Sequence, residues 1–309
     1  MEQAVYLKNL TAPQGKVDVV LDTDAYNEID DQYAISYLLS YGERFCIKGI
    51  CAAPFLNEKA ASVADGMEKS FFEIHKILRL ARREELIPVT YRGSEVFLPD
   101  EQTPVVSDAA RFMAELSNEY SPESPLYIIA LGAITNVASA LLMNPAMKEN
   151  TVIVWLGGHA HHMPHTKEFN MQQDVASARV VFGSGVPVVQ LPCMGVVDVL
   201  RTSRYELEHW LCGKNALCDY LVENAIREAE SYAAGKPWTR VIWDVTPVAW
   251  LVAGDRPFMT DDLRPIPIPE YDHTYRLDES RHLMRYVTSI DRDAVFEDLF
   301  YRLGERMGL

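Results

Sequence analysis

Cysteines and long apolar runs are both scarce in this sequence. Its 309 residues include only five cysteines, and none of them forms a Cys-x-x-Cys pair. A disulfide framework or a cysteine zinc site is therefore not supported, and we expect reduced thiols packed in a core. No apolar stretch approaches the roughly 20 residues that span a bilayer, and the start, Met1-Glu2-Gln3, lacks the basic and apolar regions of a signal peptide. We therefore expect a cytoplasmic protein.

Positively charged residues are also scarce. Lysine and arginine number 29 against 44 aspartates and glutamates, which gives a formal net charge of −15. This balance argues against nucleic acid or an anionic membrane as a partner. Neither Gly-x-Gly-x-x-Gly nor a Gly-Lys-Ser/Thr loop occurs, so a dinucleotide or ATP site has no support. Apolar residues make up 48% of the chain, enough for a large core, and without a linker or repeat we expect one domain over residues 1–309.

Apolar runs and helical patterns alternate along the first two-thirds of the chain. Strands are expected at residues 17–21, 45–52, 126–130, 152–156 and 186–190. Helices are expected between them, at residues 30–41, 58–82, 108–120, 135–143 and 175–183. Such alternation predicts an α/β fold with an open, mostly parallel sheet flanked by helices. Further along, we expect helices over 203–233, an edge hairpin or irregular segment over 264–277, and an amphipathic helix over 293–303.

The most informative segment follows the first expected strand and reads Asp22-Thr-Asp-Ala-Tyr-Asn-Glu-Ile-Asp-Asp31. It places five carboxylates between the end of a strand and the start of a helix. Such anions repel one another unless a bound cation or protons neutralise them. Oxygen ligands at this density suit Ca²⁺ or Mg²⁺. The carboxyl end of a strand is also where open α/β sheets place a ligand. The alternative is a solvated acidic loop that caps the following helix.

Three later segments would reach the same edge of the sheet. Residues 130–136, Ala-Leu-Gly-Ala-Ile-Thr-Asn, offer free carbonyl groups at a strand end as neutral ligands. The Glu168-Phe169-Asn170 segment carries a carboxylate and an amide that can grip vicinal hydroxyls. Asp244, after an apolar run, can complete an oxygen cage with Asp24 and Asp31.

With these four segments in this order, the chain resembles the nucleoside hydrolase family, which prefers substrates such as inosine and uridine. That family opens with Asp-x-Asp, a short turn and Asp-Asp, and it carries Gly-x-x-Thr-Asn, Glu-Phe-Asn and a late Asp. The resemblance implies a Rossmann-like fold and hydrolysis of the N-glycosidic bond of a ribonucleoside, which releases ribose and free base. It also implies bound Ca²⁺, with Mg²⁺ as a possible substitute, and a homodimer or homotetramer.

The resemblance further implies roles for individual residues. The metal would be held by Asp24, Asp31, the carbonyl of Leu131 and Asp244. Asp24 would also accept a proton from water. The ribose hydroxyls would be held by Asp30, Glu168 and Asn170, with Asp22 supporting the loop from behind.

The acidic turn departs from the family pattern because it is two residues longer. Asn27 or Glu28 can therefore enter the site as an extra ligand or ribose contact, although a solvated Glu28 is equally compatible with the sequence. The Asn that normally follows the second strand is also missing, since residues 52–55 read Ala-Ala-Pro-Phe. Asn57 could replace it only by a different path, and we expect Asn57 to be a polar loop residue.

Two candidate catalytic positions also differ from the family. His162 stands where the family often has a ribose-binding Asn, and it belongs to a cluster with His159, His161 and His165. That cluster could bind Zn²⁺, but we favour a loop in which one imidazole reaches the sugar or base. Trp243 replaces a His that helps protonate the leaving base in one branch of the family. Its indole could stack on a purine, or it could be a core residue.

Two alternatives remain beside the hydrolase. An Asp-x-Asp phosphohydrolase of the haloacid-dehalogenase type also begins with a strand and this motif, but it calls for Gly-Thr where Ala25 and Tyr26 follow. A relative of the same fold could instead bind Ca²⁺ and a ribosyl ligand without turnover.

Overall fold

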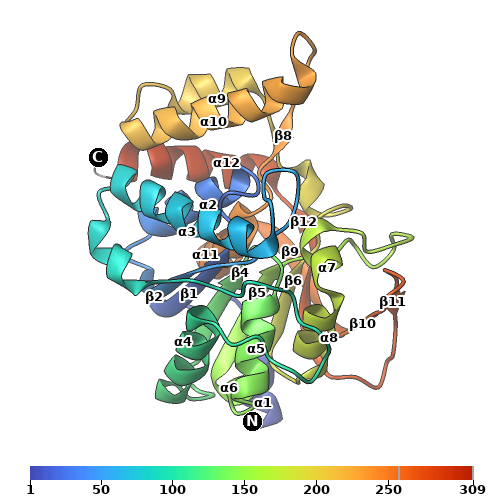
Figure 1. Cartoon of the computed structure of the whole chain (residues 1–309). Helices are drawn as coiled ribbons and strands as arrows, with labels where there is room; N and C mark the ends of the chain where they lie inside the picture. The colour runs from blue at the N-terminus through green and yellow to red at the C-terminus, as the bar shows by residue number, and fades with distance from the viewer. Residues whose placement is uncertain (257, 308–309) are drawn as a thin grey trace.

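The computed structural model describes residues 1–256 and 258–307. At its centre lies an eight-stranded sheet in the order β3-β2-β1-β4-β5-β6-β12-β9 (Figure 1). Neighbouring strands are parallel except for the antiparallel pair β12 and β9. The prediction of an α/β fold with an open, mostly parallel sheet is therefore confirmed.

The eight strands differ widely in length. They are β1 Val17–Thr23, β2 Phe45–Ala52, β3 Thr90–Tyr91, β4 Leu126–Ala130, β5 Thr151–Leu156, β6 Val188–Leu191, β9 Met259–Pro265 and β12 Leu283–Ile290. Two small ribbons lie outside this sheet, β7 Arg201–Thr202 with β8 Arg240–Val241, and β10 Ile268–Pro269 with β11 Tyr275–Arg276. Every residue of β4 and β5 is buried, as expected for central parallel strands with both faces covered.

Helices cover both faces of the sheet (Figure 1). They are α1 Gln3–Asn9, α2 Asp30–Ser40, α3 Val63–Leu80, α4 Asp108–Leu116, α5 Thr135–Met143, α6 Met147–Asn150, α7 Phe169–Gln173, α8 Val175–Gly183, α9 Arg204–Leu211, α10 Ala216–Ala233, α11 Val245–Val252 and α12 Arg292–Tyr301. The alternation of side chains along β1 divides the core in two. Val19 and Leu21 belong to the buried cluster that includes residues of α2, α3, α10 and α11, whereas Val20 belongs to the cluster that includes residues of α4, α5 and α8.

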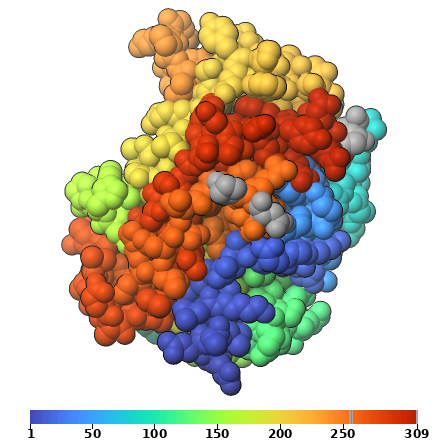
Figure 2. Space-filling view, turned by 180° about the vertical axis from the view of Figure 1, so that it is seen from behind, coloured from blue at the N-terminus to red at the C-terminus, as the bar shows by residue number. Residues whose placement is uncertain are grey.

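Segments that are distant in sequence meet at the rear of the molecule. Figure 2 shows the N-terminal residues lying against the late strand region, and α12 lying beside the α9 and α10 layer. The Tyr6 hydroxyl donates to the carbonyl of Leu283 at 2.6 Å, and Arg285 Nε donates to the carbonyl of Leu10 at 2.6 Å. Helix α1 is thereby fastened to β12.

Several expected boundaries need correction. The helix expected over 58–82 begins only at Val63, because the Ser62 side chain accepts a hydrogen bond from the Asp65 N–H and caps the helix there. The helix expected over 108–120 ends at Leu116 and continues as a 3₁₀ turn over Ser117–Glu119. Within 264–277, where an edge hairpin or irregular segment was expected, the structure forms the end of β9 and the small β10 and β11 hairpin. Helix α1 and strand β12 were not predicted.

None of the helices in the described residues is both long and apolar enough to cross a membrane. All five cysteines are free thiols.

Candidate active site

Parallel pairing brings the carboxyl ends of four strands to one edge of the sheet. β1 ends at Thr23, β4 at Ala130, β5 at Leu156 and β6 at Leu191, and a pocket of about 220 Å³ opens beside them. The pocket gathers ten residues that the sequence singled out, namely Asp24, Asn27, Glu28, Asp30, Asp31, Leu131, Glu168, Asn170, Trp243 and Asp244. Four chain segments far apart in sequence thus converge on one site.

Three aspartates form the tightest group in this pocket. Each of Asp30, Asp31 and Asp244 offers a carboxylate oxygen, and these three oxygens lie within 4.8 Å of one another. Asp30 and Asp31 begin helix α2, whose positive end favours anions, and Asp244 directly precedes α11. Within residues 1–256 and 258–307, no other such set of three His, Cys, Asp or Glu ligands occurs.

Three carboxylate oxygens at this end of the pocket have no hydrogen-bond partner among the described residues. Asp24 Oδ2, Asp30 Oδ1 and Asp244 Oδ1 are buried and accept no hydrogen bond from the described residues. Burial raises the pKa of all three carboxyls well above the usual range, and repulsion from neighbouring carboxylates raises it further. Burial also raises the pKa of Asp31 to about 7. An oxygen-only, anionic and unsatisfied donor set of this kind fits a hard divalent cation.

A second layer of polar contacts holds the acidic loop in place. The Thr23 hydroxyl donates to Asp31 Oδ1. Asn136, from the Gly-x-x-Thr-Asn segment, donates from Nδ2 to Asp22 Oδ1 at 2.8 Å and to the carbonyl of Ala52 at 3.1 Å. A Cβ added to Gly132 would stand 3.0 Å from the Asp24 carboxylate, a contact close enough that the carboxylate would have to shift. Asp22 itself lies behind the pocket and does not line it.

The side chains of Glu168 and Asn170 both form hydrogen bonds with backbone groups. Glu168 caps helix α7, since Oε1 accepts from the Asn170 N–H at 2.8 Å and Oε2 accepts from the Gly158 and Met171 N–H groups at 2.8 and 2.9 Å. Asn170 Nδ2 donates to the carbonyls of Leu131 and Leu156 at 2.6 and 3.0 Å. The Asn170 amide therefore turns its oxygen, an acceptor, away from these carbonyls.

The extra length of the acidic loop is accommodated at the pocket wall. Glu28 does line the pocket, but its Oε2 accepts from Arg240 Nη2 at 3.0 Å. The same nitrogen donates to Glu228 Oε1 on α10 at 2.8 Å. The carboxylate of Glu28 is thereby ion-paired and tied to α10 through Arg240, whereas Asp30, Asp31 and Asp244 form no ion pair within residues 1–256 and 258–307.

The histidine cluster divides among different environments. His159 lines the pocket, is 8% exposed, and its Nδ1 accepts from the Met194 N–H at 3.4 Å. His161 lies away from the pocket, with a ring nitrogen 3.0 Å from Gln190 Oε1. The candidate His162 is exposed and does not line the pocket, because a turn closed by the Met163 N–H on the carbonyl of Ala160 directs the chain outward. The structure thus brings His159 to the site in place of His162.

Trp243 lies at the pocket wall in a half-buried position. Its backbone N–H donates to Asp30 Oδ2 at 3.2 Å, which couples the Trp243-Asp244 segment to the acidic loop. Its indole remains a candidate for stacking on a base.

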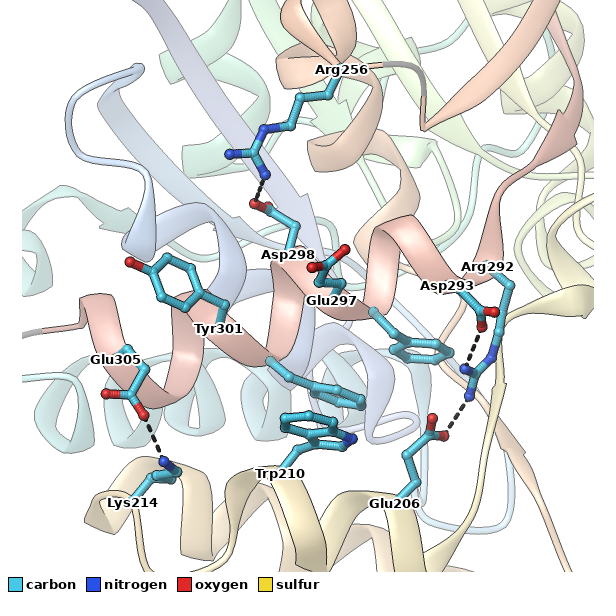
Figure 3. Close-up of a pocket in the computed structure, with 12 residues that line it drawn as sticks. Glu206, Trp210, Lys214, Arg256, Arg292, Asp293, Glu297, Asp298, Tyr301 and Glu305 are labelled. Carbon is cyan, nitrogen blue, oxygen red and sulfur yellow. Dashed lines mark hydrogen bonds and ion pairs between the residues drawn. The ribbon is translucent and has the colours of Figure 1, made fainter.

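A larger hollow of about 690 Å³ lies between α9 and α12 (Figure 3). Its charged side chains are largely paired with one another, as in Lys214 with Glu305 at 2.6 Å and Arg256 with Asp298 at 2.5 Å. Trp210 stacks on Phe300 with ring centres 6.4 Å apart. Because its charges compensate one another, we assign the chemistry to the smaller acidic pocket.

Several site residues were missed in the sequence. Cys193 and Met194 line the pocket because they follow β6, a signal that the strand pattern could have supplied. Lys167, which directly precedes the Glu-Phe-Asn segment, also lines the pocket and was not singled out. Arg240 carries no local motif and is recognisable only from its tertiary contacts.

Comparison with known proteins agrees with this geometry. The family model described as inosine-uridine preferring nucleoside hydrolase matches residues 19–297. A probable ribonucleoside hydrolase of Dictyostelium discoideum is 28% identical over 97 residues, which are 31% of this chain and 28% of that protein. A pyrimidine-specific ribonucleoside hydrolase of Citrobacter koseri is 33% identical over 108 residues, 34% of this chain and 33% of that protein. The chain therefore matches about a third or less of the length of these two curated relatives.

Solved structures match over nearly the whole chain. A plant nucleoside hydrolase superposes with a TM-score of 0.71 at 18% identity, covering 94% of this chain and 99% of the other. A purine-preferring ribonucleoside hydrolase from Gardnerella vaginalis gives a TM-score of 0.72 at 19% identity with the same coverage. At this level of identity the likeness establishes a common fold.

Proposed function

The chain belongs to the inosine-uridine preferring nucleoside hydrolase family, and we propose that it hydrolyses the N-glycosidic bond of a ribonucleoside with the help of a bound divalent cation, Ca²⁺ or alternatively Mg²⁺. The observation that carries this proposal is the buried group of three carboxylates, Asp30, Asp31 and Asp244, at the carboxyl edge of the sheet, of which Asp31 and Asp244 would hold the cation. Asp24 and the carbonyl of Leu131 line the same pocket and complete the proposed cage. When bound, such a cation polarises water and lowers the pKa of that water by several units.

Side chains of the protein accept the proton, bind the ribose and stabilise the developing charge. Asp24 presents a buried, unpartnered Oδ2 that can take the proton from the attacking water. Asp30 and the free oxygen of Asn170 accept hydrogen bonds from ribose hydroxyls. Glu168 fixes the loop that presents Asn170. As the glycosidic bond breaks, positive charge develops on the ribosyl carbon, and the surrounding carboxylates stabilise it.

The base lies beyond the carboxylates in this proposal. Trp243 provides a flat aromatic face on which the base can stack. His159 is the imidazole that reaches the pocket, whereas the exposed His162 contributes no contact there.

Release of ribose tests the proposal directly. A panel of purine and pyrimidine ribonucleosides is incubated with the protein in Ca²⁺, in Mg²⁺ and in EDTA, and free sugar is measured. Ribose that appears with the cation and disappears with EDTA is the expected result. No release from any nucleoside would contradict it, and p-nitrophenyl phosphate in parallel reveals a phosphohydrolase.

The resemblance also leads us to propose a cytoplasmic homodimer or homotetramer. Light scattering coupled to gel filtration measures the mass in solution, and a mass near the 35.0 kDa of one chain would refute the oligomer.

A further inference from the structure

Acceptor atoms dominate the floor of the acidic pocket. Four aspartates line it, and the Asn170 amide nitrogen is already engaged by the carbonyls of Leu131 and Leu156. Such a floor suits the hydroxyl groups of a sugar, which can donate. It does not suit a nucleobase, whose ring nitrogens and carbonyl oxygens present lone pairs and require donors. A donor must therefore come from the wall.

Asn27 belongs to that wall, and its backbone and side-chain oxygen are held by three hydrogen bonds. Its N–H donates to the carbonyl of Asp24 at 2.7 Å, and its own carbonyl accepts from Lys59 Nζ at 2.6 Å. Its side-chain Oδ1 accepts from Asn57 Nδ2 at 2.7 Å. The residue is 7% exposed, so neither its backbone nor its side chain has room to rearrange freely.

These contacts determine which way the Asn27 amide faces. The Lys59 N–H donates to Asn57 Oδ1 at 2.8 Å, so Asn57 must turn its nitrogen toward Asn27. Asn27 must then turn its oxygen toward Asn57. Its Nδ2, with two N–H donors, forms no hydrogen bond within residues 1–256 and 258–307, while the residue lines the pocket. The local network therefore leaves a donor for the ligand.

We propose that Asn27 Nδ2 donates a hydrogen bond to a lone pair of the nucleobase beside the glycosidic nitrogen, and that Asn57 is a positioning residue that orients it. The acceptor would be N3 of a purine or O2 of a pyrimidine, so this contact admits both classes of ribonucleoside. This inference rests on the proposed hydrolase function.

The contact gains strength as the reaction proceeds. The bond between C1′ and the base nitrogen breaks with its electron pair passing to the base, while water adds its hydroxyl to C1′ and its proton finally to the base. The base lone pairs become stronger acceptors as that negative charge builds, so a fixed donor stabilises the transition state more than the bound substrate. The effect of Asn27 should accordingly fall on kcat more than on KM.

Paired substrates test the contact. Adenosine is compared with 3-deazaadenosine, and uridine with 2-thiouridine, whose sulfur is a weaker acceptor. p-Nitrophenyl β-D-ribofuranoside serves as a ribosyl substrate whose leaving group needs no such donor. The variants are Asn27→Ala, Asn57→Ala and the double variant, with Glu58→Ala as a control because Glu58 is an exposed residue of the same turn.

We expect Asn27→Ala to lower kcat by about 10²-fold on the better of adenosine and uridine, the usual effect of losing one fixed donor. It should leave hydrolysis of the p-nitrophenyl riboside at the wild-type rate and erase the difference within each substrate pair. Asn57→Ala should show the same pattern with a smaller loss, and the double variant should be no worse than Asn27→Ala. Glu58→Ala should match the wild type throughout.

Equal losses on nucleosides and on the p-nitrophenyl riboside would overturn the proposal, because Asn27 would then serve the ribose or the fold. Full activity of Asn27→Ala on nucleosides would overturn it as well. Hydrolysis of the p-nitrophenyl riboside by each variant shows that the variant is folded. A wild-type protein that cleaves no nucleoside instead refutes the hydrolase function itself.

Discussion

Replacing Asp244 by asparagine should stabilise the protein in the absence of a divalent cation. Asp244 sits in the group of three carboxylates whose oxygens lie within 4.8 Å of one another. Its side chain caps no N–H group of helix α11, so the isosteric amide loses no helix cap. The substitution therefore removes one buried negative charge and changes little else.

The separation of the carboxylates determines the size of the stabilisation expected from Asp244→Asn. Two unit charges no more than 4.8 Å apart repel each other by at least about 3 kcal/mol at an effective dielectric constant of about 20. Because protonation relieves part of this repulsion, we expect Asp244→Asn to raise the free energy of unfolding by about 1–3 kcal/mol in EDTA at pH 8. For a protein of this size that corresponds to a rise in melting temperature of about 2–5 °C.

The pH dependence has a definite sign. Burial and the neighbouring aspartates hold the pKa of Asp244 well above its usual range in the folded chain. The unfolded chain releases this proton near pH 4, so the folded wild type binds more protons above that pH and loses stability as pH rises. The Asp244→Asn variant does not lose this stability as pH rises. The difference in melting temperature between variant and wild type should therefore shrink when the melts are repeated at pH 5.

Thermal melts with and without Ca²⁺ are the assay. The wild type should gain about 2.7 kcal/mol at a cation concentration 100 times the dissociation constant, and the variant much less. Asp293→Asn removes the same charge at a site whose side chain is 88% exposed, and it should keep the full response to Ca²⁺. A variant that melts lower than the wild type in EDTA, or that responds to Ca²⁺ as the wild type does, would refute the reasoning.

Three further changes have expected outcomes. Asp24→Asn should lower turnover at least about 10²-fold while circular dichroism stays unchanged, since it removes the proton acceptor; near-normal turnover would contradict that role. Arg240→Met deprives Glu28 and Glu228 of their shared partner, so urea unfolding should report a loss of about 1–3 kcal/mol; a loss below about 0.5 kcal/mol would show the contacts to be dispensable. Asp298→Asn weakens a buried acceptor of two tyrosine hydroxyls and an arginine, and urea unfolding should show a cost of about 2 kcal/mol with sugar release unaffected.

The parts of the fold that local patterns encode were predictable. β4 and β5 are almost wholly apolar runs, and β1 and β2 are largely apolar. The acidic segment after β1 pointed to the site because its carboxylates stand at a strand end. The Asp30, Asp31 and Asp244 group required only that parallel strands end at the same edge.

What depended on tertiary contacts was not predictable. The sequence pattern does not predict β12, because its inward and outward residues alternate imperfectly. Its partners β6 and β9 are defined only in the folded sheet. His162 was preferred to His159 because spacing along the chain does not reveal where the loop turns. Asn57 was expected to be an ordinary loop residue, since its bond to Asn27 spans 30 positions in the sequence.

The placement of β12 has a consequence for how the chain is made on the ribosome. β12 covers the edge of β6, yet residues 192–282 must be synthesised between the two strands. At about 5–20 residues per second, that leaves β6 without its outer neighbour for on the order of ten seconds. Every residue of β6 is buried in the finished sheet, so the nascent chain carries an apolar, unpaired edge during this interval. Ribosome-bound chains arrested before residue 283 should therefore recruit chaperones, and those arrested well beyond residue 290 should release them.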